Sequence, residues 1–399
     1  MAEPYDLYMT MLFVGQGMGN LLTITQDGDK DDVVANLLMD FGAKDNRRIG
    51  PDTVEFVYNV LTAWGTTDGH LDLVTISHRD RDHWTLYYPL IDQFTKNGKN
   101  LTIGRLKHGG YKDTYAKFKR KIHGTVQNKS ILGYLTDRIN PKPPIEDYLP
   151  KKSFYSKNQP LPLLAKWGAD DEVRVIPVAV NASTESKDAS TRNNTPSLAI
   201  SIIYKFSTNP VKTRSLFLPG DATADTLRLI NNVLDAAPEL KRPVMMSVPH
   251  HGALHSIASN YNTNSPKLDV ADQFAAKIWA LSIGASAGFN TYRHPEDSVF
   301  AVFRPYLSKA GLHDYVSYFP AKRPAGTWRA TRNTREAIYT NYTSYPSDGS
   351  PPRARRILFK LAADGGVTIA VLPPGGASLD VAATRSFTAM PSVRAQASG

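Results

Sequence analysis

Cysteine does not occur anywhere in this 399-residue sequence. Its absence excludes disulfide bonds, cysteine nucleophiles and zinc sites made of thiolates. Any bound metal must therefore be held by histidine, aspartate or glutamate side chains.

Long apolar runs are absent as well, since no stretch approaches the roughly 18 apolar residues that a membrane-spanning helix needs. The N-terminal residues include Glu3 and Asp6 and lack the basic start and apolar run of a secretory signal. We therefore expect a cytoplasmic protein without a membrane segment.

The overall composition, 41% hydrophobic and 21% charged, is typical of a globular protein with a sizeable core. The net charge is +10, which points towards polyanionic partners. Most of this excess lies in one segment, because residues 105–157 contain thirteen Lys and Arg against four acidic residues. The basic segment is therefore a better indicator of a polyanionic partner than the net charge of the whole chain.

One short motif carries the most chemical information, and it follows an apolar run at residues 73–76 that is typical of a buried strand. It places two imidazoles and two carboxylates within six residues, reading His78-Arg79-Asp80-Arg81-Asp82-His83. The two arginines could balance the carboxylates, so an ordinary charged loop is the alternative. A metal site is favoured because surface loops rarely combine these ligand types directly after a buried strand.

Three further predicted strands also lead to His or Asp side chains. The strand at residues 215–218 is followed by Asp221, the one at 244–248 by His250 and His251, and the one at 278–283 leads through a glycine towards His294. Binding sites are commonly built in the loops at strand ends. We therefore expect these residues to gather around the His78–His83 motif.

A glycine-rich stretch at residues 15–19, with Asp40 further along, imitates a dinucleotide-binding fingerprint. That fingerprint requires a helix after the glycines, whereas residues 21–25 read as a strand, and Asn20 stands where its last glycine would be. A nucleotide-cofactor site is therefore rejected.

The basic segment combines an aromatic stripe with positive charge. Tyr111, Tyr115, Phe118 and Ile122 recur at helical spacing, which predicts a helix and favours core packing over base stacking. The basic side chains off this stripe are candidates for binding nucleic acid, with a solvated surface as the alternative, and they are Lys112, Lys117, Lys119, Arg120 and Lys121.

With these motifs together, the sequence resembles the metallo-β-lactamase superfamily, and within it the hydrolase domain of ComEC-type competence proteins. Besides His78-x-Asp80-x-Asp82-His83, the matches are Val14-Gly15-Gln16-Gly17, Asp40-Phe41-Gly42, residues 194–198, Leu218-Pro219-Gly220-Asp221, Val248-Pro249-His250-His251-Gly252 and residues 290–295. The third-motif histidine of the superfamily has no clear counterpart, because only His108 and His123 lie between His83 and His250, and both are expected at the surface.

The resemblance implies an α/β fold, an αββα sandwich in which two mixed β-sheets pack face to face with helices outside. It favours one catalytic domain over residues 1–372, with a basic helical insert at about residues 105–192. Residues 373–399 are small, polar and aperiodic, so we expect them to form a disordered tail.

The first functional hypothesis is a metal-dependent phosphodiesterase that cuts nucleic acid, DNA rather than RNA, with two divalent ions. His78 and Asp80 would hold one ion, Asp82 and His83 the other, and Asp221 would bridge them. Carboxylates at three of these positions favour Mn²⁺, and the histidines favour Zn²⁺.

The remaining site residues have less definite roles at this level. Either His250 or His251 would complete a metal site while the other contacts phosphate, and His294 would be a ligand or the proton donor to the leaving group. Asp82 and His294 are the candidate catalytic residues, and Asp40 is expected to orient a ligand from behind.

Two other classes of function stay open from the sequence. One is a metallo-hydrolase of a small ester, lactone or nucleotide, which would have no need of a basic flank. The other is a binding protein with a degenerate site, disfavoured because every motif retains a residue able to bind metal.

Overall fold

The structure is a computed structural model. It describes residues 5–15, 17–26, 32–43, 46–62, 68–110, 115, 118–122, 125–147, 152–182, 196–208, 210–260, 265–286, 294–307, 316–320, 328–330, 337–344 and 353–373. The sequence expectations for residues 112, 117, 123 and 194, and for the tail from residue 374, lie outside these ranges.

The first large sheet has eight strands in the order β21-β20-β1-β2-β3-β4-β5-β8. Its strands are β1 (Tyr5–Met11), β2 (Gly19–Gln26), β3 (Val33–Phe41), β4 (Gly69–Ile76), β5 (Leu101–His108), β8 (Ile145–Asp147), β20 (Arg356–Leu361) and β21 (Val367–Leu372). β3, β4, β5 and β8 run parallel, while the other neighbours pair antiparallel. The sheet is therefore mixed.

The second large sheet has seven strands in the order β17-β14-β13-β12-β11-β10-β9. Its strands are β9 (Ala165–Trp167), β10 (Val173–Ala179), β11 (Ala199–Thr208), β12 (Val211–Leu218), β13 (Met245–Ser247), β14 (Ile283–Ala285) and β17 (Ile338–Thr340). β12, β13, β14 and β17 are parallel and the rest antiparallel, so this sheet is mixed as well.

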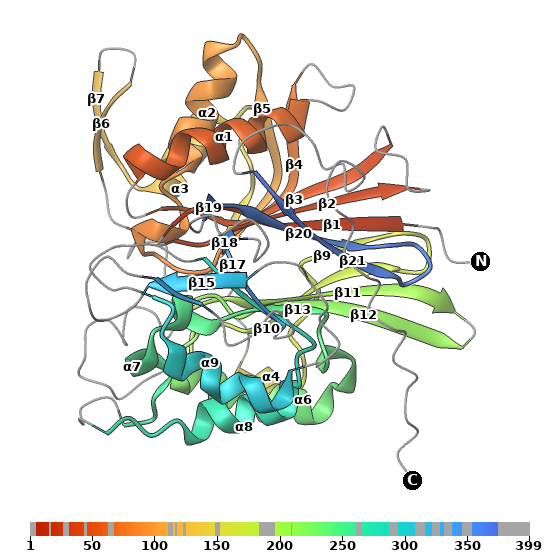
Figure 1. The fold of residues 1–399 in the computed structure, drawn as a ribbon. Helices are drawn as coiled ribbons and strands as arrows, with labels where there is room; N and C mark the ends of the chain where they lie inside the picture. The colour runs from red at the N-terminus through yellow and green to blue at the C-terminus, as the bar shows by residue number, and fades with distance from the viewer. Residues whose placement is uncertain are drawn as a thin grey trace.

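Three apolar clusters define the layers (Figure 1). The central cluster joins the facing sides of the two sheets, for example Leu37 and Leu73 with Ile202 and Leu216. Helices α1 (Asn46–Thr62), α2 (Tyr87–Lys96) and α3 (Ile131–Arg138) cover the outer face of the first sheet. Helices α6 (Ala224–Ala236), α8 (Asp269–Ile278) and α9 (Asp297–Phe303) cover the second. The predicted αββα sandwich is therefore confirmed.

Smaller elements complete the described part of the chain. They include the helices α4 (Lys152–Ser156) and α7 (Leu254–Ile257), the 3₁₀ helices η3 (Pro238–Leu240) and η5 (Arg304–Tyr306), and a minor sheet ordered β16-β15-β18-β19. The strands of this sheet are β15 (Val316–Pro320), β16 (Trp328–Ala330), β18 (Tyr342–Ser344) and β19 (Arg353–Ala354). None of the helices in the described ranges has the length and apolar character to cross a membrane.

The helical prediction for the basic insert is wrong in part. Residues 118–122 form β6 (Phe118–Ile122), which pairs antiparallel with β7 (Thr125–Lys129) in a separate two-stranded ribbon. Phe118 and Ile122 are four residues apart, a spacing that also puts them on one face of a strand, and the β-branched Ile122 favours extended backbone. The insert also includes β8, β9 and β10, and its longest described helix is α3.

Two further expectations need correction. His108 is fully buried at the end of β5, where its ring packs edge-on against Tyr115 at 5.2 Å between centroids, so it is no surface residue. The strand expected at residues 278–283 is displaced, because α8 ends at Ile278 and β14 begins at Ile283. A short apolar run is compatible with either element, and here its first residue belongs to the helix.

Candidate metal centre

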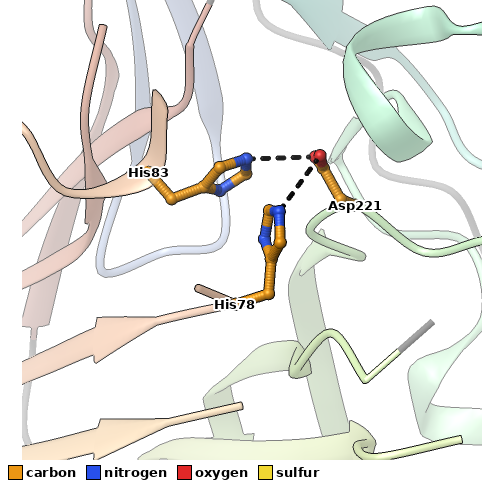
Figure 2. A group of neighbouring side chains, drawn as sticks. All are labelled: His78, His83 and Asp221. Atoms are coloured by element: carbon orange, nitrogen blue, oxygen red, sulfur yellow. Dashed lines mark ion pairs between the residues drawn. The ribbon is translucent and has the colours of Figure 1, made fainter. Parts of the chain in front are cut away.

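The candidate site lies where strands of both sheets end. β4 leads into His78, and the short 3₁₀ helix η1 (Arg81–His83) carries Asp82 and His83. From the second sheet, Asp221 follows the end of β12, and His250 and His251 lie in the turn η4 (Pro249–Gly252) after β13. Figure 2 shows the rings of His78 and His83 directed at the carboxylate of Asp221.

Asp221 is the centre of the arrangement, and its two carboxylate oxygens face different histidines. Oδ2 lies 3.5 Å from Nε2 of His78 and 3.5 Å from Nε2 of His250. Oδ1 lies 3.3 Å from Nε2 of His83 and 3.3 Å from Nε2 of His251. The carboxylate therefore stands between two pairs of imidazoles.

Each pair of imidazoles has a second carboxylate beside it. Oδ2 of Asp80 is 3.8 Å from Nε2 of His78, and Oδ2 of Asp82 is 3.6 Å from Nε2 of His251. We define group A as His78, Asp80 and His250 with Oδ2 of Asp221, and group B as Asp82, His83 and His251 with Oδ1.

The donor atoms are close enough to share a cation. In the set of His78, His83 and Asp221, and again in the set of Asp82, His83 and His251, all ligand atoms lie within 4.8 Å of one another. Nε2 of His78 and Oδ1 of Asp221 are buried and have no hydrogen-bond partner among the described residues. Buried polar atoms normally have a partner, so a divalent cation fits this set of nitrogen and oxygen donors.

The charges within the site are strongly interdependent. Burial alone lowers the pKa of His83, but the carboxylates of Asp221 and Asp40 outweigh it and hold that pKa well above its usual range. Burial raises the pKa of Asp221, yet the surrounding imidazoles, His251 and His83 foremost, bring it well below its usual range. The pocket thus favours an ionised Asp221 beside positive charge. A bound metal ion would supply that positive charge in place of the protons on the histidines.

Asp40 and Ser77 hold the two histidines of the first sheet from behind. Oδ2 of Asp40 lies 2.9 Å from Nδ1 of His83, and its Oδ1 accepts a hydrogen bond from the Ser77 amide at 2.6 Å. Oγ of Ser77 lies 3.0 Å from Nδ1 of His83 and 3.2 Å from Nδ1 of His78. Both rings thereby turn Nε2 towards Asp221. Ser77 was not singled out in the sequence, where its only signal is its position directly before His78.

The turn that carries the second pair of histidines has an unusual backbone. His250, His251 and Gly252 all have positive φ, at 46°, 51° and 79°, a conformation that residues with a side chain rarely adopt. The amide of His250 donates to the carbonyl of Gly220 at 3.1 Å, which ties this turn to the loop of Asp221. Such local strain is characteristic of functional sites.

Glycines allow the loops of the site to approach closely. A side chain at Gly42 would lie 2.3 Å from the amide nitrogen of Trp84 and 2.5 Å from that of His83. One at Gly17 would lie 2.0 Å from the carbonyl oxygen of Gly42. The end of β3 therefore packs backbone to backbone against the His78–His83 loop.

The other predicted site residues are His294 and the basic residues of the insert. His294 belongs to neither set of potential ligands, and its Nδ1 lies 4.0 Å from Oε1 of Glu296. Lys119, Arg120 and Lys121 form the middle of β6. Lys112 and Lys117 lie outside the described residues.

Comparisons with known proteins are limited to distant structural likeness. No protein-family model and no curated protein matches the sequence. Among solved structures, the metallo-β-lactamase fold protein YhfI from Bacillus subtilis has 13% identity, covers 77% of this chain and 94% of its own, and has a TM-score of 0.38.

Two further solved structures have similar coverage. A diphosphatase of the PhnP family has 12% identity, with 70% and 85% of the two chains covered and a TM-score of 0.32. The short form of human tRNase Z has 9% identity, with 70% and 90% covered and a TM-score of 0.34. Because these scores are low, the function must be argued from this chain's own residues.

Proposed function

We propose that this protein is a metal-dependent phosphodiesterase that hydrolyses nucleic acid, DNA in preference to RNA. One observation carries the proposal: Asp221 presents one carboxylate oxygen to group A and the other to group B. A carboxylate shared in this way suits two neighbouring divalent cations. When bound, such a pair activates water and neutralises the charge of a phosphoryl oxygen and of the leaving oxygen.

His250 and His251 would both be ligands in this proposal, one in each group. The sequence left open which of them binds metal and lacked a counterpart for the superfamily's third-motif histidine. His250 supplies the missing imidazole for group A, since it lies 3.5 Å from the same Asp221 oxygen as His78. Phosphate contact would then pass to other residues.

Proton transfer to the leaving group would be the role of His294. It lies outside both ligand sets, and its side chain is only 13% exposed. The nearby carboxylate of Glu296 is 6% exposed and accepts a hydrogen bond from the Leu254 amide, which holds it on the side of the η4 turn. A carboxylate beside an imidazole can orient the ring for proton transfer.

The basic insert supports a polymeric, negatively charged substrate. Its β6–β7 ribbon stands apart from the sandwich beside α3, as Figure 1 shows. A two-stranded ribbon with Lys119, Arg120 and Lys121 in one strand suits phosphate contacts, and we propose that Lys112 and Lys117 extend this surface.

The proposal is tested by incubating the purified protein with labelled single- and double-stranded DNA and RNA in Mn²⁺. Parallel reactions with an excess of chelator, and with the Asp221→Asn variant, serve as controls. We expect cleavage of DNA that both controls abolish. Cleavage of an activated ester, a lactone or free nucleotides, with all four polymers left intact, would instead support the small-substrate hydrolase.

A further inference from the structure

A small cavity lies directly behind His251, between the ends of β1 and β2 in one sheet and β13 and β14 in the other. Its volume is about 20 Å³, and its lining includes Met11, Met18, Asn20, Ser247, His251 and Gly284. His251 is the only lining residue that belongs to groups A and B. The cavity therefore adjoins the candidate metal centre through His251.

Two side chains of the lining are polar, buried and unsatisfied. Oδ1 of Asn20 and Oγ of Ser247 have no hydrogen-bond partner among the described residues, and the two residues are only 2% and 5% exposed. They come from opposite sheets, Asn20 from β2 and Ser247 from β13. Since buried polar atoms nearly always have a partner, two such atoms at one cavity indicate an occupant.

The volume restricts what this occupant can be. One water needs roughly 10–15 Å³ of such space and two to four polar neighbours. A cavity of about 20 Å³ with an amide, a hydroxyl and an imidazole in its wall meets both conditions.

The ring of His251 needs such a neighbour. Its Nε2 is directed at Oδ1 of Asp221, 3.3 Å away, and at Oδ2 of Asp82, 3.6 Å away. A histidine that binds metal through Nε2 nearly always donates its Nδ1 proton to an acceptor, which fixes the ring. His83 has Asp40 for this purpose and His78 has Ser77. His251 has no corresponding partner among the side chains that the structure describes.

We propose that the cavity is a binding site for one ordered water, which accepts the Nδ1 proton of His251 and is held by Asn20 and Ser247. These two side chains are then positioning residues for group B. They act on the metal only through the water and the ring of His251. The inference rests on the proposed function in one respect alone, namely that group B binds a cation.

The test compares Ser247→Thr with Ser247→Val, because the two replacements have the same shape and differ in the hydroxyl group. Each variant is titrated with Co²⁺, whose visible absorption reports the ligand geometry of each bound ion. We expect Ser247→Val to weaken one of the two binding events by roughly 10- to 100-fold and to change its spectrum. Ser247→Thr should retain most of the affinity. Equal Co²⁺ affinity in the two variants would overturn the proposal.

A control and a second measurement address folding. Ser201→Val removes another buried hydroxyl from the second sheet, one that donates to the Leu216 carbonyl away from the cavity, and it should leave Co²⁺ binding unchanged. If Ser247→Val fails to fold, a high-resolution crystal structure of the unaltered protein shows whether a water occupies the cavity. A water within hydrogen-bond distance of Asn20, Ser247 and Nδ1 of His251 is the expected result, and a dry cavity would refute it.

Failure of the proposed function gives a different pattern. A protein that cleaves no nucleic acid but still shows the difference between Ser247→Thr and Ser247→Val would retain the water site and lose only the phosphodiesterase assignment. A protein that cleaves nucleic acid but binds Co²⁺ equally well in Ser247→Thr and Ser247→Val would retain the phosphodiesterase assignment and lose the water site.

Discussion

Oδ2 of Asp40 lies 2.9 Å from Nδ1 of His83, and the same carboxylate accepts the backbone amide of Ser77 through its other oxygen. One residue at the end of β3 thus fixes both the ring of His83 and the strand end that precedes His78. Asp40 has a φ of 53°, so its backbone adopts an uncommon conformation to present the side chain in this way.

The first prediction is that Asp40→Asn lowers metal affinity by about 10- to 100-fold without loss of the fold. The amide keeps the shape of the carboxylate but removes the charge that favours a proton on Nδ1, so the ring of His83 is held less firmly. Calorimetric titration with Mn²⁺ measures the effect. Asp72→Asn is the matched control, since Asp72 accepts the Asn36 amide within the same sheet and lies outside both groups. Unchanged affinity in Asp40→Asn would contradict the assignment.

The second prediction concerns the carboxylates that face the metal. Asp82→Ala and Asp221→Ala should each reduce phosphodiesterase turnover by about 1,000-fold, equivalent to about 4 kcal/mol of transition-state stabilisation. Both variants should remain folded, because each change removes a polar ligand and leaves the three apolar clusters intact. Circular dichroism checks the fold. Near-normal rates in either folded variant would show that the two-metal assignment is wrong.

The third prediction tests the close packing of the site loops. Gly42→Ala should lower the free energy of unfolding by about 1–3 kcal/mol and weaken metal binding, because the new methyl group would lie 2.3 Å from the Trp84 amide. Gly133→Ala in α3 is the control, since its nearest neighbour would be 3.7 Å away and alanine favours helix. Urea unfolding gives both values. Equal stability of the two variants would mean that the His78–His83 loop moves aside readily.

The fourth prediction is that the basic insert contributes affinity more than chemistry. Neutralising Lys117, Lys119, Arg120 and Lys121 should flatten the dependence of log K on log salt by about 0.9 for each lost contact to duplex phosphate. The control neutralises three lysines and one arginine that are exposed elsewhere, namely Lys96, Lys212, Arg242 and Lys267. Identical slopes in the two variants would mean that the basic residues of the insert form an ordinary solvated surface and do not bind nucleic acid.

Much of the candidate site was predictable because its residues stand in short motifs at strand ends. His78 and His83 lie in one short motif directly after β4, so their meeting could be expected from the sequence, whereas Asp221 follows β12 of the other sheet and reaches them only because the two sheets pack together. The pairing of His250 with His78 could not, because it depends on contact between two sheets and on the left-handed turn of η4. Ser77 could not be identified from the sequence either, because its role depends on contacts of its hydroxyl with Nδ1 of His78 and Nδ1 of His83, which only the folded structure brings together.

The ribbon β6–β7 shows where local pattern is ambiguous. Phe118 and Ile122 share a face in a helix and in a strand alike, and five residues are too few to separate the two periods. Pairing with β7 favours the strand, which is information that lies outside the segment itself. The αββα layers were expected from the family resemblance, and the strand-rich order of the sequence agreed with it, although β9, β13, β14 and β17 are only three residues long.

The last prediction concerns which metal supports activity. Groups A and B contain three carboxylates, Asp80, Asp82 and Asp221, beside four imidazoles and no thiolate. Oxygen-rich sites suit Mn²⁺ comparatively well, whereas an added imidazole favours Zn²⁺. We therefore expect the highest activity with Mn²⁺, and a shift of the preference towards Zn²⁺ in Asp80→His.

Affinity and activity must be measured separately in that experiment, because zinc binds more tightly than manganese at almost any site of this kind. Chelator-stripped protein is reconstituted with each metal, its metal content is determined, and rates are compared at full occupancy. Asp80→Asn serves as the matched control, since it removes the charge of Asp80 without adding an imidazole. Activity with zinc and none with manganese in the unaltered protein would defeat the argument from oxygen ligands. A preference that moves equally in Asp80→His and Asp80→Asn would assign the effect to charge alone.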